Sequence, residues 1–235
     1  MIGATGEDLF ELGIDEAAPD GAARAGMTRA VLFDFNGTLS YDEPVWFEVY
    51  RELYAERGRP ITHEEYFGQL AGLSDAEGVR MWLGEDDPEL IERGIDRYLA
   101  AAGDGSTVPA AAREAVAAAA ARVPVGIVTT AKRHVLDRIL AAAGLVPHLA
   151  FTVTAEDVTR TKPDPEGYLV ALSRLPGIEP ADVLVLEDTP LGVAAAKAAG
   201  MRCAAVLGSA TAERLAGADE IVGSLDAETI LRLLG

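Results

Sequence analysis

Residues 30–39 read Ala-Val-Leu-Phe-Asp-Phe-Asn-Gly-Thr-Leu, an apolar run that passes through an aspartate into a glycine-containing turn. A short run of this kind is typical of a parallel strand that is buried on both faces. In doubly wound sheets, ligands bind beyond the carboxyl ends of the strands. The polar residues at the end of this predicted strand, residues 30–35, are therefore candidates for a functional site.

Four further apolar runs follow along the chain, at residues 123–129, 149–153, 183–187 and 203–207. Helical patterns lie between and after them, at residues 133–143, 166–175, 191–199 and 226–234. Strands that alternate with helices imply right-handed crossovers and a parallel sheet. The sequence therefore predicts an α/β fold with a doubly wound, Rossmann-like parallel sheet.

The interval 42–110 contains no convincing strand, and its patterns are helical. The predicted helices cover residues 43–57, 62–70, 74–83 and 88–102. Two of them open with a serine or threonine followed three residues later by glutamate, at Thr62 and Ser74, which is the capping-box pattern. The interval is therefore predicted to be an all-helical cap inserted after the first strand.

The remaining residues divide into a core and an extension. Residues 27–41 and 111–235 are predicted to form the catalytic core. Residues 1–26 are acidic and rich in alanine and glycine, with no clear period, so we expect an N-terminal extension without ordered structure.

The composition of the 235 residues excludes several classes of protein. Hydrophobic residues make up 49% and charged residues 25%, the balance of a globular domain, and the formal net charge is −18. Such an acidic chain is not expected to bind nucleic acid or anionic membranes, and no apolar run is long enough to span a bilayer. Cys203 is the single cysteine, which favours a reducing, cytoplasmic setting. Oligomeric state is not predicted.

The negative charge is concentrated in the cap. Residues 42–110 carry a net charge of −10, whereas residues 111–235 carry −3. An acidic cap that closes over the core would disfavour densely anionic substrates unless one of its arginines turned inward. We expect Arg80, Arg93 and Arg97 to lie at the surface instead.

Polar side chains at the ends of the predicted strands should meet at one edge of the sheet. They are Asp34, Asn36, Thr129, Thr130, Lys162, Glu187 and Asp188. Carboxylates brought this close together repel one another unless a cation neutralises them, and hard oxygen ligands with open positions favour Mg²⁺. Backbone amides after Asp34 and near Ala131 could bind an anion. The sequence thus indicates a site for a metal and an anion.

Four motifs in this order resemble the haloacid dehalogenase (HAD) superfamily of hydrolases, in the branch with a helical C1 cap after the first strand. The motifs lie at residues 34–39, 127–129, 162–165 and 187–193. The β-phosphoglucomutase-like and phosphoglycolate phosphatase-like members are the most similar. The resemblance covers about residues 27–235 and implies an enzyme of the hydrolase class.

The resemblance also implies roles for the phosphate-binding residues. Asp34 would be the nucleophile that forms an aspartyl phosphate. Thr129, with Thr130 beside it, would bind phosphoryl oxygens. Lys162 would neutralise Asp34 and the transferring group.

The same resemblance implies a Mg²⁺ site. Asp188 would hold the ion together with Asp34 and the backbone carbonyl of Asn36, and Glu187 would assist directly or through water. The implied function is a Mg²⁺-dependent phosphatase of a small phosphorylated metabolite, either a phosphoric monoester or an acyl phosphate.

Asn36 departs from the family pattern, in which an aspartate two residues after the nucleophile protonates the leaving oxygen and later activates water. An amide cannot transfer a proton in that role. The substrate could have a good leaving group, such as an acyl phosphate. Another group could supply the proton, with Asp42, Glu43, a cap residue or the substrate itself as candidates. Finally, turnover could be slow or lost.

Two alternative functions follow from these observations. One is a catalytically weak or inactive ligand-binding or regulatory protein, which Asn36 favours. The other is a phosphomutase. Enzymes that resemble β-phosphoglucomutase often carry basic residues around a cap glycine, whereas the corresponding stretch here, Ala71-Gly72-Leu73-Ser74-Asp75, has none, which argues against this function. Residues 42–110 contain no lysine, which argues against a Schiff-base mechanism.

Overall fold

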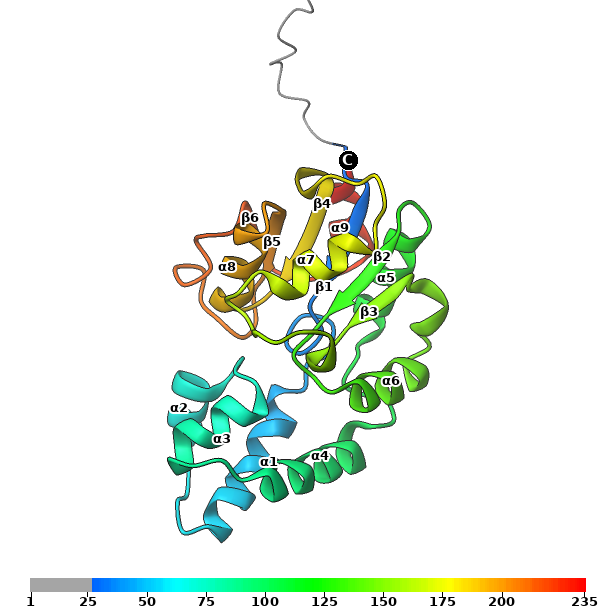
Figure 1. The fold of residues 1–235 in the computed structure, drawn as a ribbon. Helices are drawn as coiled ribbons and strands as arrows, with labels where there is room; N and C mark the ends of the chain where they lie inside the picture. Colours follow the sequence, from blue (N-terminus) through cyan, green and yellow to red (C-terminus); the bar gives the residue numbers. More distant parts are fainter. Residues whose placement is uncertain (1–26) are drawn as a thin grey trace, which may run out of the picture.

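The computed structural model describes residues 27–235, and the expected N-terminal extension lies outside the described residues. The core is a six-stranded sheet in the order β3-β2-β1-β4-β5-β6, and every strand pair is parallel (Figure 1). The strands are β1 (Ala30–Phe33), β2 (Val125–Val128), β3 (Phe151–Val153), β4 (Val183–Glu187), β5 (Arg202–Val206) and β6 (Glu220–Val222). The predicted α/β, doubly wound parallel sheet is confirmed.

Helices cover both faces of this sheet, which explains why its central strands are apolar throughout. Those of the core are α5 (Ala110–Ala120), α6 (Arg133–Ala142), α7 (Glu166–Ser173), α8 (Pro190–Ala198) and α9 (Ala227–Leu234). On β1, Val31 and Phe33 belong to a cluster that includes side chains of α5, α6 and α9. Ala30 and Leu32 face the opposite cluster, with side chains of α7 and α8. Three 3₁₀ turns, Val146–His148, Ala155–Asp157 and Pro180–Asp182, complete the core.

The interval between β1 and β2 forms the helical cap. Its helices are α1 (Glu43–Glu56), α2 (His63–Glu65), α3 (Asp75–Leu83) and α4 (Pro88–Ala102). Thr62 and Ser74 both form the capping boxes that the sequence predicted. The helix predicted for residues 62–70 is shorter than expected, because after one α-helical turn the backbone widens into a π-helical turn at Tyr66–Leu70.

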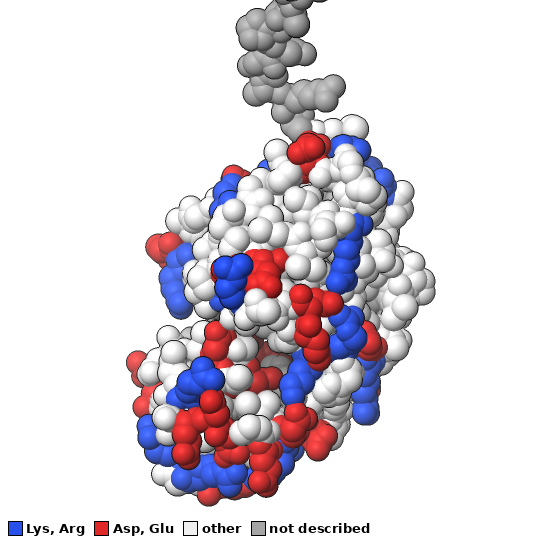
Figure 2. Space-filling view, in the orientation of Figure 1, with Lys and Arg blue, Asp and Glu red and all other residues white. Residues whose placement is uncertain are grey.

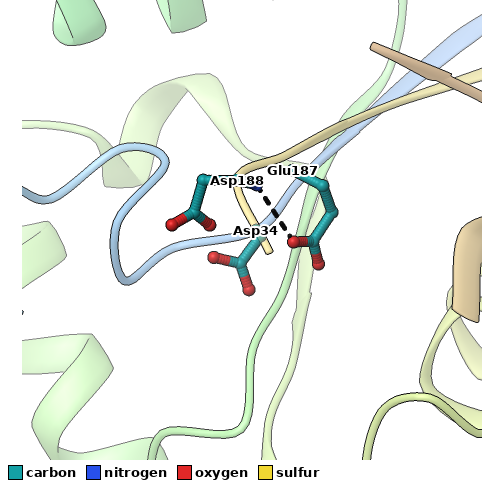
Figure 3. Close-up of side chains that lie close together, drawn as sticks. All are labelled: Asp34, Glu187 and Asp188. Carbon is teal, nitrogen blue, oxygen red and sulfur yellow. Dashed lines mark hydrogen bonds between the residues drawn. The ribbon is translucent and has the colours of Figure 1, made fainter. Parts of the chain in front are cut away.

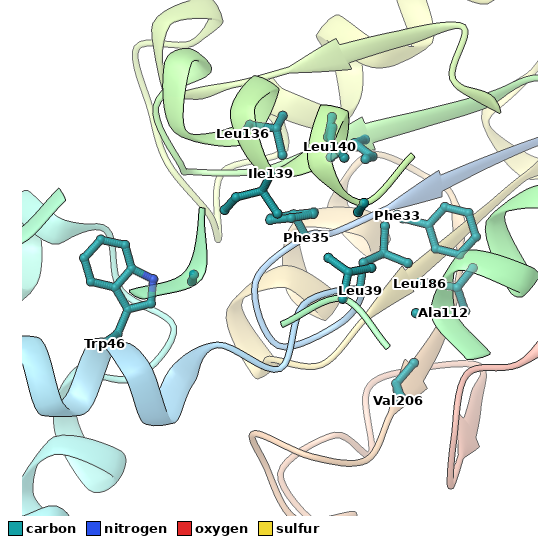
Figure 4. Close-up of a cluster of buried hydrophobic side chains, with 14 of the residues drawn as sticks. Phe33, Phe35, Leu39, Trp46, Ala112, Leu136, Ile139, Leu140, Leu186 and Val206 are labelled. Carbon is teal, nitrogen blue, oxygen red and sulfur yellow. The ribbon is translucent and has the colours of Figure 1, made fainter. Parts of the chain in front are cut away.

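The cap lies beyond the carboxyl end of β1 (Figure 1), and its apolar side chains continue the core cluster. Phe35 and Leu39, in the loop that leads from β1 to the cap, belong to the same cluster as Trp46 on α1 (Figure 4). Trp46 stacks on Tyr98 of α4, with the ring centroids 4.1 Å apart. The loop between strand and cap is thereby anchored on both sides.

Two predictions of strand structure are corrected. The first strand was predicted to reach residue 35, but β1 ends at Phe33, because the carbonyl of Phe35 accepts hydrogen bonds from Leu39 and Ser40 in a tight turn. The edge strand β6 was not predicted, since it has three residues and begins with the exposed Glu220. Among the described residues, no helix is both long and apolar enough to cross a bilayer.

Candidate active site

Three carboxylates meet where β1 and β4 end side by side. Phe33 pairs with Leu186 in the sheet, so Asp34 follows β1 beside Glu187, the last residue of β4, and Asp188, which comes directly after β4. Asp34, Glu187 and Asp188 are buried, and each offers an oxygen within 4.8 Å of the others (Figure 3). Burial raises the pKa of Asp34 well above its ordinary value, an effect that Lys162 opposes and the other two carboxylates reinforce.

Lys162 is the cation of this cluster. Its Nζ lies 2.5 Å from Asp34 Oδ1 and 2.5 Å from Glu187 Oε1. Burial lowers the pKa of Lys162, but the two carboxylates outweigh burial and hold the pKa above its usual range. The ammonium group therefore stays charged beside Asp34, where it can neutralise an incoming anion.

Asp188 carries the strongest indication of a metal. Its Oδ1 accepts a hydrogen bond from Thr38 Oγ1 at 2.9 Å, whereas its buried Oδ2 has no partner with hydrogen-bond geometry among the described residues, although the Ser209 hydroxyl lies close enough to lower the pKa of Asp188. Burial, with help from Glu187, raises the pKa of Asp188 to about 7. A buried carboxylate oxygen without a partner is costly unless a cation binds it. Hard carboxylate oxygens such as those of Asp34 and Asp188 fit Mg²⁺.

Glu187 belongs to the carboxylate cluster but has no free oxygen. Its Oε1 accepts from Lys162 and from the Tyr168 hydroxyl, at 2.8 Å for the latter. Its Oε2 accepts from the backbone amide of Asp188 and the hydroxyl of Thr189. These contacts fit a residue that positions Lys162, and direct metal binding by Glu187 stays a prediction.

Of the two threonines after β2, only Thr130 lines the cavity that lies between the core and the cap. Thr129 is buried, its Oγ1 accepts from the amide of Ala131, and it lies 3.3 Å from Asn36 Oδ1. Thr130 and Ala131 line this cavity between the core and the cap, and Thr130 also lines, with Thr129, a smaller cavity beside Lys162. A phosphoryl oxygen in the cavity between core and cap would therefore meet Thr130, and contact with Thr129 stays a prediction.

The Asn36 side chain is fixed in one orientation. Its Nδ2 donates to Asp42 Oδ2 at 2.6 Å, and its Oδ1 accepts from Thr129. Asp42 is fully buried, and Tyr98 donates to the same Asp42 oxygen. Burial raises the pKa of Asp42 to about 6.

A cavity between the core and the cap joins these groups to the cap. From the core, Asp34, Asn36, Thr130 and Lys162 line it. From the cap come two carboxylates and four aromatic side chains, namely Glu43, Asp75, Trp46, Tyr50, Tyr54 and Tyr66. No cap lysine or arginine is among its lining residues within the described range.

The cap arginines lie at the surface, as the sequence predicted. Arg80 pairs with Asp86, Arg93 with Glu56, and Arg97 with both Glu52 and Glu56. Figure 2 shows this interleaving of positive and negative side chains over the cap. None of the three arginines lines the cavity.

The structure thus brings Asp34, Asn36, Lys162, Glu187 and Asp188 into one cluster, with Thr129 and Thr130 beside it. Sequence reasoning missed the tyrosine hydroxyls that donate to the carboxylates of the site, those of Tyr50, Tyr66, Tyr98 and Tyr168. No signal in the sequence marks them, because each reaches its carboxylate through tertiary packing.

Comparisons with known proteins agree with the motifs. A family model for hydrolases, described as haloacid dehalogenase-like hydrolase, matches residues 28–200. The validoxylamine A 7'-phosphate phosphatase of Streptomyces hygroscopicus subsp. limoneus is 34% identical over 204 residues, which cover 85% of this chain and 95% of that protein. The phosphorylated carbohydrates phosphatase of Thermotoga maritima is 31% identical over 179 residues, covering 73% and 82%.

The fold has a similar solved structure. The crystal structure of CbbY from Rhodobacter sphaeroides in complex with phosphate superposes with a TM-score of 0.75 at 26% identity. The superposition covers 85% of this chain and 95% of that chain. The resemblance inferred from the four motifs is confirmed.

Proposed function

Because this chain belongs to the haloacid dehalogenase-like hydrolases, we propose that it is a Mg²⁺-dependent phosphatase that acts on a small phosphorylated metabolite through an aspartyl phosphate. Its assignment as a phosphatase follows from the named activities of its relatives. The metal, the intermediate and the class of substrate are proposed from the site.

The observation that carries the proposal is the position of Asp34 between Lys162 and Asp188. An anionic nucleophile that attacks an anionic phosphoryl group must overcome charge repulsion. Lys162 Nζ, 2.5 Å from Asp34 Oδ1, offsets that repulsion and the charge that develops in the transition state. Thr130, which lines the cavity, offers a hydroxyl group and a backbone amide to the phosphoryl oxygens, whereas the amide of Ala131 donates to Thr129 Oγ1.

The carboxylates of the cluster support the proposed Mg²⁺ site. Asp34 and Asp188, together with the backbone carbonyl of Asn36, would hold Mg²⁺, and the unpartnered Asp188 Oδ2 supports this assignment. When bound, the ion would neutralise phosphoryl oxygens and the carboxylates themselves. Glu187 would keep Lys162 in place through the hydrogen bonds described above.

The cap residues that line the cavity support a proposal for the class of substrate. Glu43 and Asp75 face the cavity, and the cap arginines do not. The favoured substrate is therefore a monophosphate whose leaving group carries no second phosphate and offers hydroxyl groups to the cap carboxylates and tyrosines. The relatives named for phosphorylated carbohydrates and validoxylamine A 7'-phosphate support a hydroxyl-rich leaving group.

The acidic cap residues that line the cavity also argue against a phosphomutase. A mutase must hold a second phosphate against the cap, and Glu43 and Asp75 would repel it there. Asn36 favours the inactive, ligand-binding alternative. Against it, the proposed nucleophile Asp34, Lys162 and the carboxylates of the proposed metal site lie within one cluster, as catalysis requires.

Phosphate release tests the proposal. We expect the protein to release inorganic phosphate from p-nitrophenyl phosphate and from hexose or hexitol monophosphates with Mg²⁺, and to lose this activity in EDTA and in Asp34→Asn. Failure to release phosphate from a broad panel of phosphate esters and acetyl phosphate, with Mg²⁺ present and the protein folded, would overturn it.

A further inference from the structure

Cleavage of an alkyl phosphate raises a problem of proton transfer at this site. The alkoxide that leaves needs a proton, and Asn36 has none to give. Its amide is also occupied, because Nδ2 donates to Asp42 and Oδ1 accepts from Thr129. Another group of the cavity must therefore carry the proton, and the following inference rests on the proposed phosphatase function.

Most titratable groups of the cavity do not suit this role. Asp34 is the proposed nucleophile, and Lys162 is held by two carboxylates that keep it protonated. Burial raises the pKa of the Tyr50, Tyr54 and Tyr66 hydroxyls above the ordinary tyrosine value, so none of the three exchanges protons near neutral pH.

Asp42 is excluded by its position. It is fully buried and is not among the residues that line the cavity. Its Oδ2 accepts from both Asn36 and Tyr98, so the carboxylate serves to fix the loop between strand and cap. Two carboxyls of the cavity remain, Glu43 and Asp75.

Glu43 and Asp75 lie in different electrostatic surroundings. Glu43 is the first residue of α1 and feels the charge of Asp34. Asp75 is the first residue of α3, and its carboxyl accepts a hydrogen bond from the Tyr50 hydroxyl at 2.7 Å. Of the two carboxyls, Glu43 is therefore the one that lies on the segment leading from Asp34, at the reacting end of the cavity, and the charge of Asp34 contributes to its raised pKa.

We propose that Glu43 is the proton-transfer residue of this active site and takes the role that Asn36 cannot fill. In the first step an Asp34 oxygen bonds to phosphorus, the ester P–O bond breaks, and the Glu43 carboxyl gives its proton to the leaving oxygen. In the second step water attacks phosphorus, the bond to Asp34 breaks, and Glu43 takes the proton that the water loses. The products are an alcohol and inorganic phosphate, and Glu43 is again protonated.

The environment of Glu43 suits both steps. Burial and then the charge of Asp42 raise its pKa to about 7, and Asp34 adds a smaller rise. The Tyr66 hydroxyl, which donates to Glu43 Oε2 at 3.2 Å, and the backbone amide of Gly72 oppose the rise. A proton-transfer group works best when its pKa lies near the working pH.

Substitution of Glu43 by glutamine tests this role, because glutamine keeps the shape and loses the proton. The single-turnover rate should be compared for p-nitrophenyl phosphate, whose leaving group needs no proton, and for a hexitol monophosphate, whose leaving group does. In E43Q we expect the release of p-nitrophenol in the first turnover to stay within about threefold of the wild-type rate. Release of the hexitol should fall by roughly 10²–10⁴-fold.

Two control variants separate this role from a general disturbance of the cap. Asp75→Asn removes the other carboxyl of the cavity, which can contact the hydroxyl groups of the substrate. It should raise the concentration of hexitol ester needed for saturation, but leave the ratio of the aryl to the alkyl rate at saturation unchanged. Glu48→Gln changes an exposed residue of α1 that pairs with Arg51 and should leave both rates unchanged. If E43Q unfolds, Glu43→Asp provides a second test, since it keeps a carboxyl and should slow the alkyl ester more than the aryl ester.

The outcomes separate this inference from the proposed function. If wild type cleaves both esters and E43Q cleaves the hexitol ester at the wild-type rate, the role of Glu43 is wrong and the phosphatase stands. Equal losses on both esters would also overturn the role. If wild type cleaves neither ester, the phosphatase proposal itself fails.

Discussion

Asn36 and Asp42 are joined by a hydrogen bond of 2.6 Å between the amide nitrogen of one and a carboxylate oxygen of the other. The bond spans the loop that links β1 to α1, and Tyr98 of α4 donates to the same oxygen. Asn36 is therefore part of the connection between core and cap. This pairing explains why an amide, rather than a second carboxylate, fits at this position.

Replacing Asn36 by aspartate should consequently not produce a faster enzyme. In Asn36→Asp two carboxyls would face each other in a buried site, and we expect a loss of about 1–3 kcal/mol in the free energy of unfolding at neutral pH. Urea denaturation measures this loss. The reciprocal variant N36D/D42N restores one donor and one acceptor and should recover most of the stability. A large gain in phosphatase activity in N36D without loss of stability would contradict the account.

Removing Lys162 should affect both activity and stability. Lys162→Met takes the cation away from Asp34 and Glu187, so we expect kcat to fall by roughly 10²–10³-fold. Two buried carboxylates are left uncompensated, which should cost about 3–5 kcal/mol at neutral pH. Steady-state kinetics and denaturation at pH 7 check the two effects. Wild-type kcat in a folded K162M would rule out the proposed role of the lysine.

The pH dependence should report on Glu43. The first step needs protonated Glu43, so kcat/KM for a hexitol phosphate should decline as the pH rises through about 7. Tyr66→Phe removes a donor that lowers the pKa of Glu43, so the decline should move to higher pH. E43Q supplies the control for ionisation of the substrate itself. A decline that is identical in wild type, Y66F and E43Q would show that Glu43 does not cause it.

Substrate charge should decide selectivity. We expect kcat/KM for a hexose monophosphate to exceed that for the matching bisphosphate at least tenfold, because the cap residues Glu43 and Asp75 that line the cavity are acidic. Asp75→Asn should reduce the difference. A preference of wild type for the bisphosphate would contradict the proposed class of substrate.

Local patterns predicted most of the fold. The strand before Asp34 and the capping boxes at Thr62 and Ser74 were visible because each depends on neighbours in the sequence. The edge strand β6 and the π-helical turn Tyr66–Leu70 were not visible in the sequence. A strand of three residues and a widened helical turn depend on tertiary packing more than on sequence neighbours.

The candidate site was likewise predicted only where its residues belong to local sequence motifs. Asp34, Lys162 and Asp188 follow strands and loops that recognisable motifs mark. The sequence left Asp42 and Glu43 equivalent as proton donors. Only the packing of Tyr98 against Asp42, from 56 residues away, and the exposure of Glu43 to the cavity distinguish them.

Covalent labelling of Asp34 tests the central claim most directly. E43Q should be mixed with Mg²⁺ and ³²P-labelled p-nitrophenyl phosphate, quenched in acid and digested, and the labelled peptide should be identified by mass spectrometry. We expect phosphate on Asp34, because the first step proceeds while hydrolysis of the aspartyl phosphate is slow, and no label in E43Q/D34N. Phosphate release without any label on Asp34, or a label on another residue, would contradict the account.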